Sequence, residues 1–366
     1  MSLKSLIIKN FKSILDIHIT DIPNFSVFAG ANGSGKSNLF EALEFIKDVV
    51  KYGAKDAIRK HGGYDSIRSY KLKSPKAKVF GVFLTIDINE NHYKYMLVIR
   101  DLDSEPTIYE QIRKNGKVIA KRLHKNSLFV FGKKQDINYS SNESILKLIA
   151  IEGKELFDYL TSIVRYQIDP IKAKEADDFD ADEALNSDAS NISTVLNTLE
   201  KDNNIRDEIM ETMAMIVPNL DKILVEKERL NNKSLLMFKE KNSHKRFPAR
   251  LISDGTIYAL AMLAIIYSNK KGLVLIEEPE RGLNPQAIME LIEIFRDKSS
   301  ELNIFINTHS ESIVRVLEPK ELFLVDKKEG KTEIKNIQKT FPNYDYSKIG
   351  IDKMWMSNMF DGGLPW

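Results

Sequence analysis

Residues 30–37 read GANGSGKS and fill every position that a phosphate-binding loop requires. Glycines let successive backbone N–H groups approach phosphate oxygens closely, because they lack a Cβ and accept left-handed backbone. Lys36 is then placed to reach the β and γ phosphates, and the Ser37 hydroxyl to coordinate Mg²⁺. We therefore expect ATP and Mg²⁺ to bind at Asn32, Gly33, Ser34, Gly35, Lys36, Ser37 and Asn38.

Two adjacent carboxylates, Glu277 and Glu278, follow the wholly apolar run at residues 273–276. Such a run is typical of a strand buried on both faces of a parallel sheet, and these sheets bind ligands at the carboxyl ends of their strands. We expect Glu277 to hold Mg²⁺, usually through a water. Glu278 is then expected to orient and deprotonate the water that attacks the γ phosphate. The alternative is a solvated acidic turn.

His309 follows a second apolar run, at residues 304–306, within FINTHS. A histidine at this position can donate a hydrogen bond to the γ phosphate. Taken alone it is more often an ordinary half-buried side chain, but its place after the second buried strand favours a catalytic role. Lys36, Glu278 and His309 form the expected catalytic set.

The apolar run at residues 257–267 predicts a helix, and a polar segment precedes it. Ser253, followed by Asp254 and Gly255, lies where this helix begins. Its hydroxyl can cap the helix or point outward to a ligand, and the residues alone leave both interpretations open.

The elements that must position these residues fall into three consecutive parts of one head. Residues 1–140 are expected to form a β lobe that carries the phosphate loop, 141–250 a helical or inserted lobe, and 251–366 the second half of the site. Apolar residues predict a buried strand at 25–28 and a helix after the loop. Further strands are predicted at residues 6–11 and 14–19, two more within residues 79–99, and shorter ones through Ile119. Helical patterns occupy residues 144–164 and 192–216.

Composition sets limits on the class of protein. The 366 residues suffice for a large core, and 54 Lys+Arg against 52 Asp+Glu leave a formal charge of only +2. The absence of cysteine excludes disulfides, thiolate catalysis and cysteine-ligated zinc, which fits a cytoplasmic protein. No secretion signal is expected at the start of the chain. The longest clearly apolar run falls far short of the roughly 20 residues that cross a bilayer, so we expect no membrane association.

A basic stretch at residues 51–78 has nine lysines and arginines against two acids. Such a stretch can contact a DNA backbone, and it is equally well explained as a solvated basic loop. The candidate DNA contacts are Arg59, Lys60, Arg68 and Lys71.

The motifs GANGSGKS, LISDGT, LVLIEEPE, RGLNP and FINTHS, in this order, resemble the ABC-type ATPase heads. The resemblance is to the soluble branch with structural maintenance of chromosomes (SMC) proteins, RecF-like repair ATPases and OLD-like predicted ATPases. The opening IIKNFKSI and the closing WMSNMFDGGLPW are similar to the compact OLD-like and AAA15/AAA21-type group. The resemblance to the ABC-type heads implies an α/β P-loop NTPase fold, with a RecA-like parallel sheet core flanked by an antiparallel β lobe and a helical lobe.

This resemblance further implies that two heads clamp two ATP molecules between them. Ser253, Asp254 and Gly255 of one head would then form the signature that meets the γ phosphate bound by the other. Glu277 matches the metal position, Glu278 the catalytic base and His309 the switch histidine, and Asn284 lies where a dimer-contact loop is expected. Gln167, within RYQIDP, is a weak candidate for the lid glutamine, and that role stays open.

The leading functional hypothesis is an ATP-driven homodimeric switch that controls a separate effector, a nuclease or toxin, in bacterial defence or DNA maintenance. No sustained heptad predicts a coiled-coil arm, and too few residues follow His309 for a nuclease domain. One alternative is a scaffold that binds ATP with little turnover and sequesters a partner. Another is a transporter ATPase subunit, against which EEPE and SDGT argue.

Overall fold

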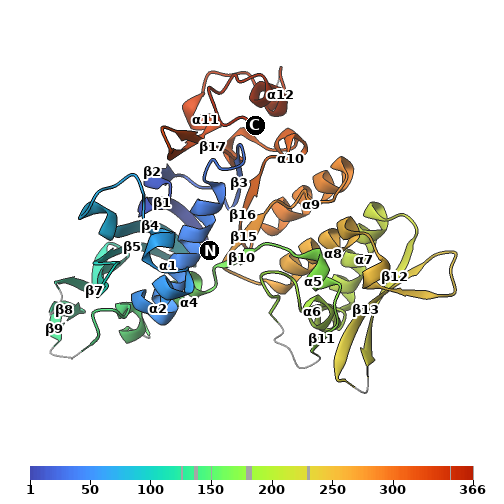
Figure 1. Cartoon of the computed structure of the whole chain (residues 1–366), viewed down its shortest axis with the longest axis horizontal. Helices are drawn as coiled ribbons and strands as arrows, with labels where there is room; N and C mark the ends of the chain where they lie inside the picture. Colours follow the sequence, from blue (N-terminus) through green and yellow to red (C-terminus); the bar gives the residue numbers. More distant parts are fainter. Residues whose placement is uncertain are drawn as a thin grey trace.

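The computed structural model describes residues 1–124, 127–135, 139–149, 151–178, 184–228, 231–346 and 348–365. A parallel sheet lies between an antiparallel β lobe, at the left of Figure 1, and a second lobe of helices and short strands, at the right. The C-terminal elements lie above the central sheet in this view (Figure 1). In the described chain, no helix is both long and apolar enough to span a membrane.

The central sheet has six strands in the order β10-β15-β16-β3-β17-β18. All neighbours are parallel except the last pair. Every residue is buried in β3, which precedes the phosphate loop, and in β15, which ends at Glu277. These two predicted buried strands are confirmed. The strands are β3 (Phe25–Ala29), β10 (Val164–Tyr166), β15 (Leu273–Glu277), β16 (Asn303–Thr308), β17 (Leu322–Lys328) and β18 (Lys331–Asn336).

The β lobe is an eight-stranded antiparallel sheet in the order β2-β1-β4-β5-β6-β7-β8-β9. The hairpin register pairs Leu6 with Ile19 and Ile8 with Ile17, so the predicted alternation faces one core. The strands that follow the pair predicted within residues 79–99 are shorter, as expected, with eight residues each in the first two, and the second of them extends beyond Ile119 to His124. The strands are β1 (Ser2–Phe11), β2 (Ile14–Thr20), β4 (Phe80–Ile88), β5 (Asn91–Arg100), β6 (Thr107–Lys114), β7 (Lys117–His124), β8 (Ser127–Val130) and β9 (Lys133–Gln135).

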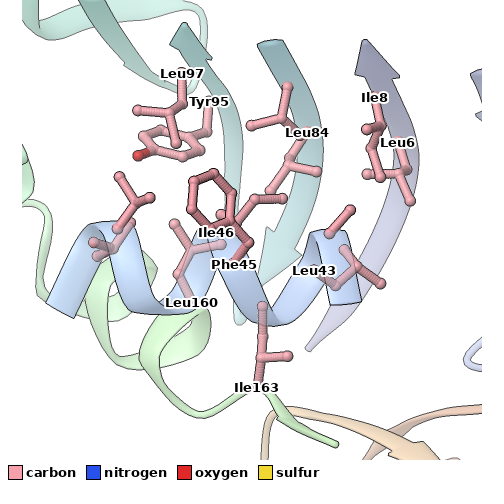
Figure 2. Close-up of a cluster of buried hydrophobic side chains, with 14 of the residues drawn as sticks. Leu6, Ile8, Leu43, Phe45, Ile46, Leu84, Tyr95, Leu97, Leu160 and Ile163 are labelled. Atoms are coloured by element: carbon pink, nitrogen blue, oxygen red, sulfur yellow. The ribbon is translucent and has the colours of Figure 1, made fainter. Parts of the chain in front are cut away.

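Helix α1 (Lys36–Tyr52) is buried between the two sheets and begins at the phosphate loop. Its apolar side chains meet those of the antiparallel sheet on one side and those around Leu160 and Ile163 on the other (Figure 2). Alternate residues of β15 face different cores: Leu275 belongs to the cluster around α1, and Ile276 to the cluster around α8 (Asp254–Ser268). The central sheet is therefore covered on both faces, as parallel sheets require.

Residues 141–250 do not form a purely helical lobe. They contribute β10 to the central sheet and α4 (Lys154–Thr161), which packs on α1. They also form a small sheet in the order β11-β13-β12, with β14 beside β13. No strand was predicted at residues 220–240, because apolar residues lie on both faces of this hairpin: Phe238 is buried, whereas Leu224 and Met237 pair on the half-buried face. The strands are β11 (Asp177–Asp178), β12 (Leu220–Glu228), β13 (Lys233–Glu240) and β14 (Arg246–Pro248).

The helical pattern at residues 192–216 is two helices, α6 (Ile192–Leu199) and α7 (Asn203–Ile216). The pattern at 144–164 contains one 3₁₀ turn and α4. Part of the acidic stretch 174–188 lies outside the described residues. The remaining helices are α2 (Ala54–Lys60), α3 (Tyr64–Ile67), α5 (Pro170–Ala173), α9 (Pro285–Lys298), α10 (Glu311–Arg315), α11 (Ile337–Thr340) and α12 (Ile351–Met356).

Candidate active site

The phosphate loop joins β3 to α1 in the strand, loop, helix order that the motif predicts. Gly33 and Gly35 have φ angles of 78° and 108°, in the left-handed region that favours glycine. A Cβ on Gly35 would also lie 2.0 Å from the Thr332 hydroxyl oxygen. The glycine is therefore required for both backbone conformation and space.

Lys36 lies at the centre of the loop and is largely buried. Its Nζ donates to the carbonyl oxygens of Gly30, at 2.7 Å, and Ala31, at 2.8 Å. Burial lowers the pKa of Lys36, while the charges of the nearby glutamates raise it in part. The ammonium and the N-terminus of α1 thus place positive charge where a phosphate would bind.

Three polar side chains brace this loop from outside it. The Thr332 hydroxyl donates to the Ser34 carbonyl oxygen at 3.0 Å and lies 2.6 Å from the Ser13 hydroxyl. Asn38, an expected nucleotide ligand, donates its amide to Ser13 at 2.6 Å. Sequence analysis missed Ser13 and Thr332, because they come from the β1–β2 turn and from β18, far from the motif in the chain.

The two expected metal ligands meet directly. The Ser37 hydroxyl donates to Glu277 Oε2 at 2.9 Å, although 240 residues separate them. Glu277 ends β15 and is only 9% exposed. A hydroxyl beside a carboxylate offers the hard oxygen ligands that Mg²⁺ prefers, so these residues fit the expected ion.

Glu278, the expected base, has φ 48°, which is unusual for a residue other than glycine. Its N–H donates to the main-chain oxygen and to Oδ1 of Asn307, each at 3.1 Å. Asn307 is 1% exposed and pairs in register with Glu277. This buried asparagine therefore holds the glutamate in its strained conformation, a role that no sequence signal indicated.

His309 lies beside the acids, at the end of β16 as expected. Its Nδ1 is 3.6 Å from Glu280 Oε1 and 3.9 Å from Glu278 Oε1. Glu280 Oε1 also accepts the Thr308 hydroxyl at 2.6 Å and the His309 N–H at 3.1 Å. Burial raises the pKa of Glu280. The third glutamate of EEPE, to which the sequence assigned no role, thus fixes the loop that carries His309.

Arg165, on β10, is a further residue that sequence analysis missed. Its guanidinium hydrogen-bonds Glu277 Oε1. It also lies 3.6 Å from a carboxylate oxygen of Glu41 and 3.6 Å from one of Glu44, both on α1. Because β10 pairs with β15, this arginine reaches the carboxylate expected to bind metal.

The signature residues lie at the start of α8, in the second lobe and away from α1 (Figure 1). Ser253 caps the helix by accepting the Thr256 N–H at 3.2 Å, so the cap interpretation is confirmed. Asp254 pairs with Lys174. In the described part of the chain, no hydrogen bond or ion pair joins residues 253–255 to the phosphate loop.

The signature contacts the loop after the acids instead. A Cβ on Gly255 would lie 2.1 Å from the Gly282 carbonyl oxygen. In that same loop Asn284 caps α9, accepting the Ala287 N–H at 2.9 Å; its dimer-contact role stays a prediction. Gln167 lines a cavity of about 570 Å³ shared with Asp254. Its lid role also stays open.

The candidate DNA contacts are mostly paired with acids. Lys60 donates to buried Asp48 at 2.8 Å, Arg59 lies 3.3 Å from Asp56, and Arg68 lies 2.7 Å from Asp65. Lys71 lies against Gly330. These pairs reduce the charge available to DNA. Counting acids within residues 51–78 missed Asp48, which lies on α1 just before the stretch.

Comparisons with known proteins agree with this geometry. The family described as "AAA domain, putative AbiEii toxin, Type IV TA system" matches residues 25–315. An "ATP/GTP phosphatase" of Helicobacter pylori is 22% identical over 343 residues, 86% of this chain and 87% of that protein. A Lactococcus lactis DNA replication and repair protein RecF is 39% identical over 46 residues, 13% of each chain.

Solved structures match over nearly the whole length. An SMC head bound to the C-terminal winged-helix domain of ScpA has a TM-score of 0.59 at 15% identity, covering 93% of this chain and 100% of that one. An SMC head with an extended coiled coil, bound to the C-terminal domain of ScpA derived from Pyrococcus furiosus, has a TM-score of 0.54 at 14% identity, covering 93% and 98%. The chain therefore belongs to the AAA-domain family that matches residues 25–315, and it is an ATPase of the SMC/RecF-like ABC type.

Proposed function

We propose that this ATPase is a switch in which two copies close head to head on two ATP molecules and reopen after hydrolysis. One observation carries the proposal. Ser37 and Glu277 are joined at the phosphate loop, whereas Ser253 lies exposed at the start of α8 with no bond to that loop. A signature hydroxyl that its own chain leaves apart from the phosphates is suited to a partner's nucleotide.

Each residue has a distinct task in this scheme. Lys36 and the loop N–H groups hold the phosphates, while Ser37 and Glu277 would hold Mg²⁺. When bound, the ion supplies charge neutralisation on the phosphate oxygens. Glu278 accepts a proton from the water that attacks the γ phosphorus, as the bond to the β-phosphate oxygen breaks and ADP leaves.

His309 acts on the far side of the γ phosphate in the proposed mechanism. An imidazole N–H can donate to a γ oxygen and stabilise the charge that develops there. Two contacts of Glu280 Oε1 support this orientation: it accepts the main-chain N–H of His309, and it lies 3.6 Å from the ring atom Nδ1. Ser253 of the second copy would donate to the same phosphate from the opposite face.

We further propose a separate effector, a nuclease or toxin, as the partner of the switch. The family description names a toxin and a toxin–antitoxin system, which supports a role in bacterial defence. The similar SMC heads were solved with ScpA domains bound, so heads of this fold can hold a second protein. DNA contact through the basic stretch is a weaker part of the proposal.

Light scattering of the Glu278→Gln chain tests the switch. With Mg²⁺ and ATP this variant should bind nucleotide, lose about 100-fold or more of its turnover and accumulate as a dimer, because the water is no longer deprotonated. A Lys36→Ala/Glu278→Gln double variant is the matched control and should stay monomeric. A Glu278→Gln chain that binds ATP and remains monomeric would contradict the proposal.

Steady-state turnover of the wild-type chain, with and without duplex DNA, separates the roles. Stimulation by DNA supports sensing of DNA by the switch. Tight ATP binding with negligible turnover under both conditions favours the sequestering scaffold instead.

A further inference from the structure

We infer that Arg165 is a positioning residue that keeps the metal carboxylate from taking a divalent cation before the triphosphate arrives. The inference rests on the proposed nucleotide site and adds to it an order of binding. Its basis is the position of one guanidinium among three carboxylates, those of Glu41, Glu44 and Glu277.

The two oxygens of Glu277 have different partners. Oε2 accepts the Ser37 hydroxyl at 2.9 Å, and Oε1 is hydrogen-bonded to Arg165. The arginine side chain is 16% exposed and that of Glu277 8%, so water screens this pair weakly. Arg165 therefore fixes the rotation of the carboxylate and directs the other oxygen at Ser37.

The same guanidinium balances the acids beside it. Glu41 and Glu44 come from one face of α1, three residues apart, and each lies 3.6 Å from a different terminal nitrogen of Arg165. Without the arginine, Glu41, Glu44 and Glu277 would lose the cation that they share, and the added negative potential at Glu277 favours a divalent cation. Lys12 pairs with Glu41 and Lys47 pairs with Glu44, whereas Glu277 pairs with Arg165.

The nucleotide-free protein offers a cation few ligands near Glu277. In the described part of the chain, no group of three or more acids, histidines or cysteines can hold a metal ion. The ligands that remain are the Ser37 hydroxyl and Glu277 Oε2, which are hydrogen-bonded to each other. Mg²⁺ demands six oxygens and commonly takes them from phosphates and waters, so it is expected to enter together with ATP.

Binding of Mn²⁺ to the nucleotide-free full chain tests the inference. It is measured by electron paramagnetic resonance as the loss of the signal of free Mn²⁺. Wild type should bind Mn²⁺ only weakly alone, and with ATP it should bind more Mn²⁺ than the same ATP binds without protein. Arg165→Gln should bind Mn²⁺ without ATP about 10 to 100 times more tightly than wild type. This is the size of effect that neighbours of metal ligands have on affinity, but here the change is a gain because a positive charge beside Glu277 is removed. Arg165→Lys keeps the charge and should behave as wild type.

Two further variants make the result specific. Arg165→Gln/Glu277→Gln should lose the Mn²⁺ gained by the single variant, because the carboxylate that takes the ion is gone. Arg296→Gln removes an arginine of similar burial that pairs with Glu293 and Glu321 on the α9 side, and it should gain no Mn²⁺. Thermal unfolding of each variant shows that it is folded.

The inference is overturned if folded Arg165→Gln takes no Mn²⁺, or if Arg296→Gln takes as much. It is also overturned if wild type binds Mn²⁺ equally well with and without ATP, a result that does not depend on any variant folding. None of these measurements needs a dimer. A negative light-scattering result would therefore defeat the switch and leave this inference standing.

Discussion

The two halves of the proposed site differ in how much of their geometry a single chain completes. At the phosphate loop, Ser37, Glu277 and Glu278 come from distant segments and are already fixed by hydrogen bonds. At the signature, the hydrogen bonds of Ser253 to other described residues stay within the first turn of its own helix. One chain therefore carries the residues that bind and position the nucleotide, whereas the proposed contact between the signature and the γ phosphate requires a second chain.

The difference follows from the sheet. The carboxyl ends of β3, β15 and β16 meet at one edge, because these strands are parallel neighbours. The α8 start belongs to the other core cluster and is tied to the loop containing Gly282 instead. The signature is therefore in contact with the loop that follows the acids, and not with the phosphate loop.

Replacing Lys36 by alanine should break the completed half and give the largest effect. The variant loses charge-assisted hydrogen bonds to two phosphates, so ATP affinity should fall about 100-fold or more. Isothermal titration with Mg²⁺ and ATP measures it. Near wild-type affinity would show that the loop backbone alone binds the nucleotide.

Replacing Ser253 by aspartate should break only the incomplete half. Aspartate caps a helix as well as serine does, so folded stability should be kept, but its charge opposes the partner's γ phosphate. ATP-dependent dimerisation should weaken by about tenfold to 100-fold, measured by light scattering. Asp202→Ala removes the cap of α7 and serves as a matched control that loses about 1 kcal/mol of stability without affecting dimerisation.

Mixing the Lys36→Ala and Ser253→Asp chains tests whether one active site takes its phosphate loop and its signature from different chains. Half of randomly mixed dimers have one intact site out of two, so the mixture should regain about a quarter of wild-type turnover. Each chain alone should be almost inactive. No recovery on mixing would place the signature and the phosphate loop in one chain's reaction.

The smallest expected effect concerns Glu280, whose pKa is raised by burial. Between its ordinary value and this raised value the folded chain binds more protons than the unfolded chain, so stability falls as pH rises. Glu280→Gln removes that loss, at about 1.4 kcal/mol per pKa unit. Urea unfolding of both chains from pH 4 to pH 8 should show the variant gaining relative to wild type. A constant difference would mean that Glu280 titrates normally.

Much of the site was predictable because its signals are local. The loop before α1, the acids after β15 and the histidine after β16 each follow a short apolar strand, and strand length and glycine spacing are visible in consecutive residues. The sheet in the second lobe was not predicted, because β12 and β13 carry apolar residues on both faces. Ser253 as a helix cap was also predictable, since helix starts favour serine.

The sequence by itself determined a phosphate loop, two carboxylates after a buried strand and the order of the motifs, because periodicity and backbone preference act over a few residues. Only the tertiary structure decided that Arg165 holds Glu277, that Asn307 fixes Glu278 and that Thr332 closes over Gly35. These contacts join segments far apart in the chain. They depend on which strands become neighbours, and strand order follows from packing of the whole core.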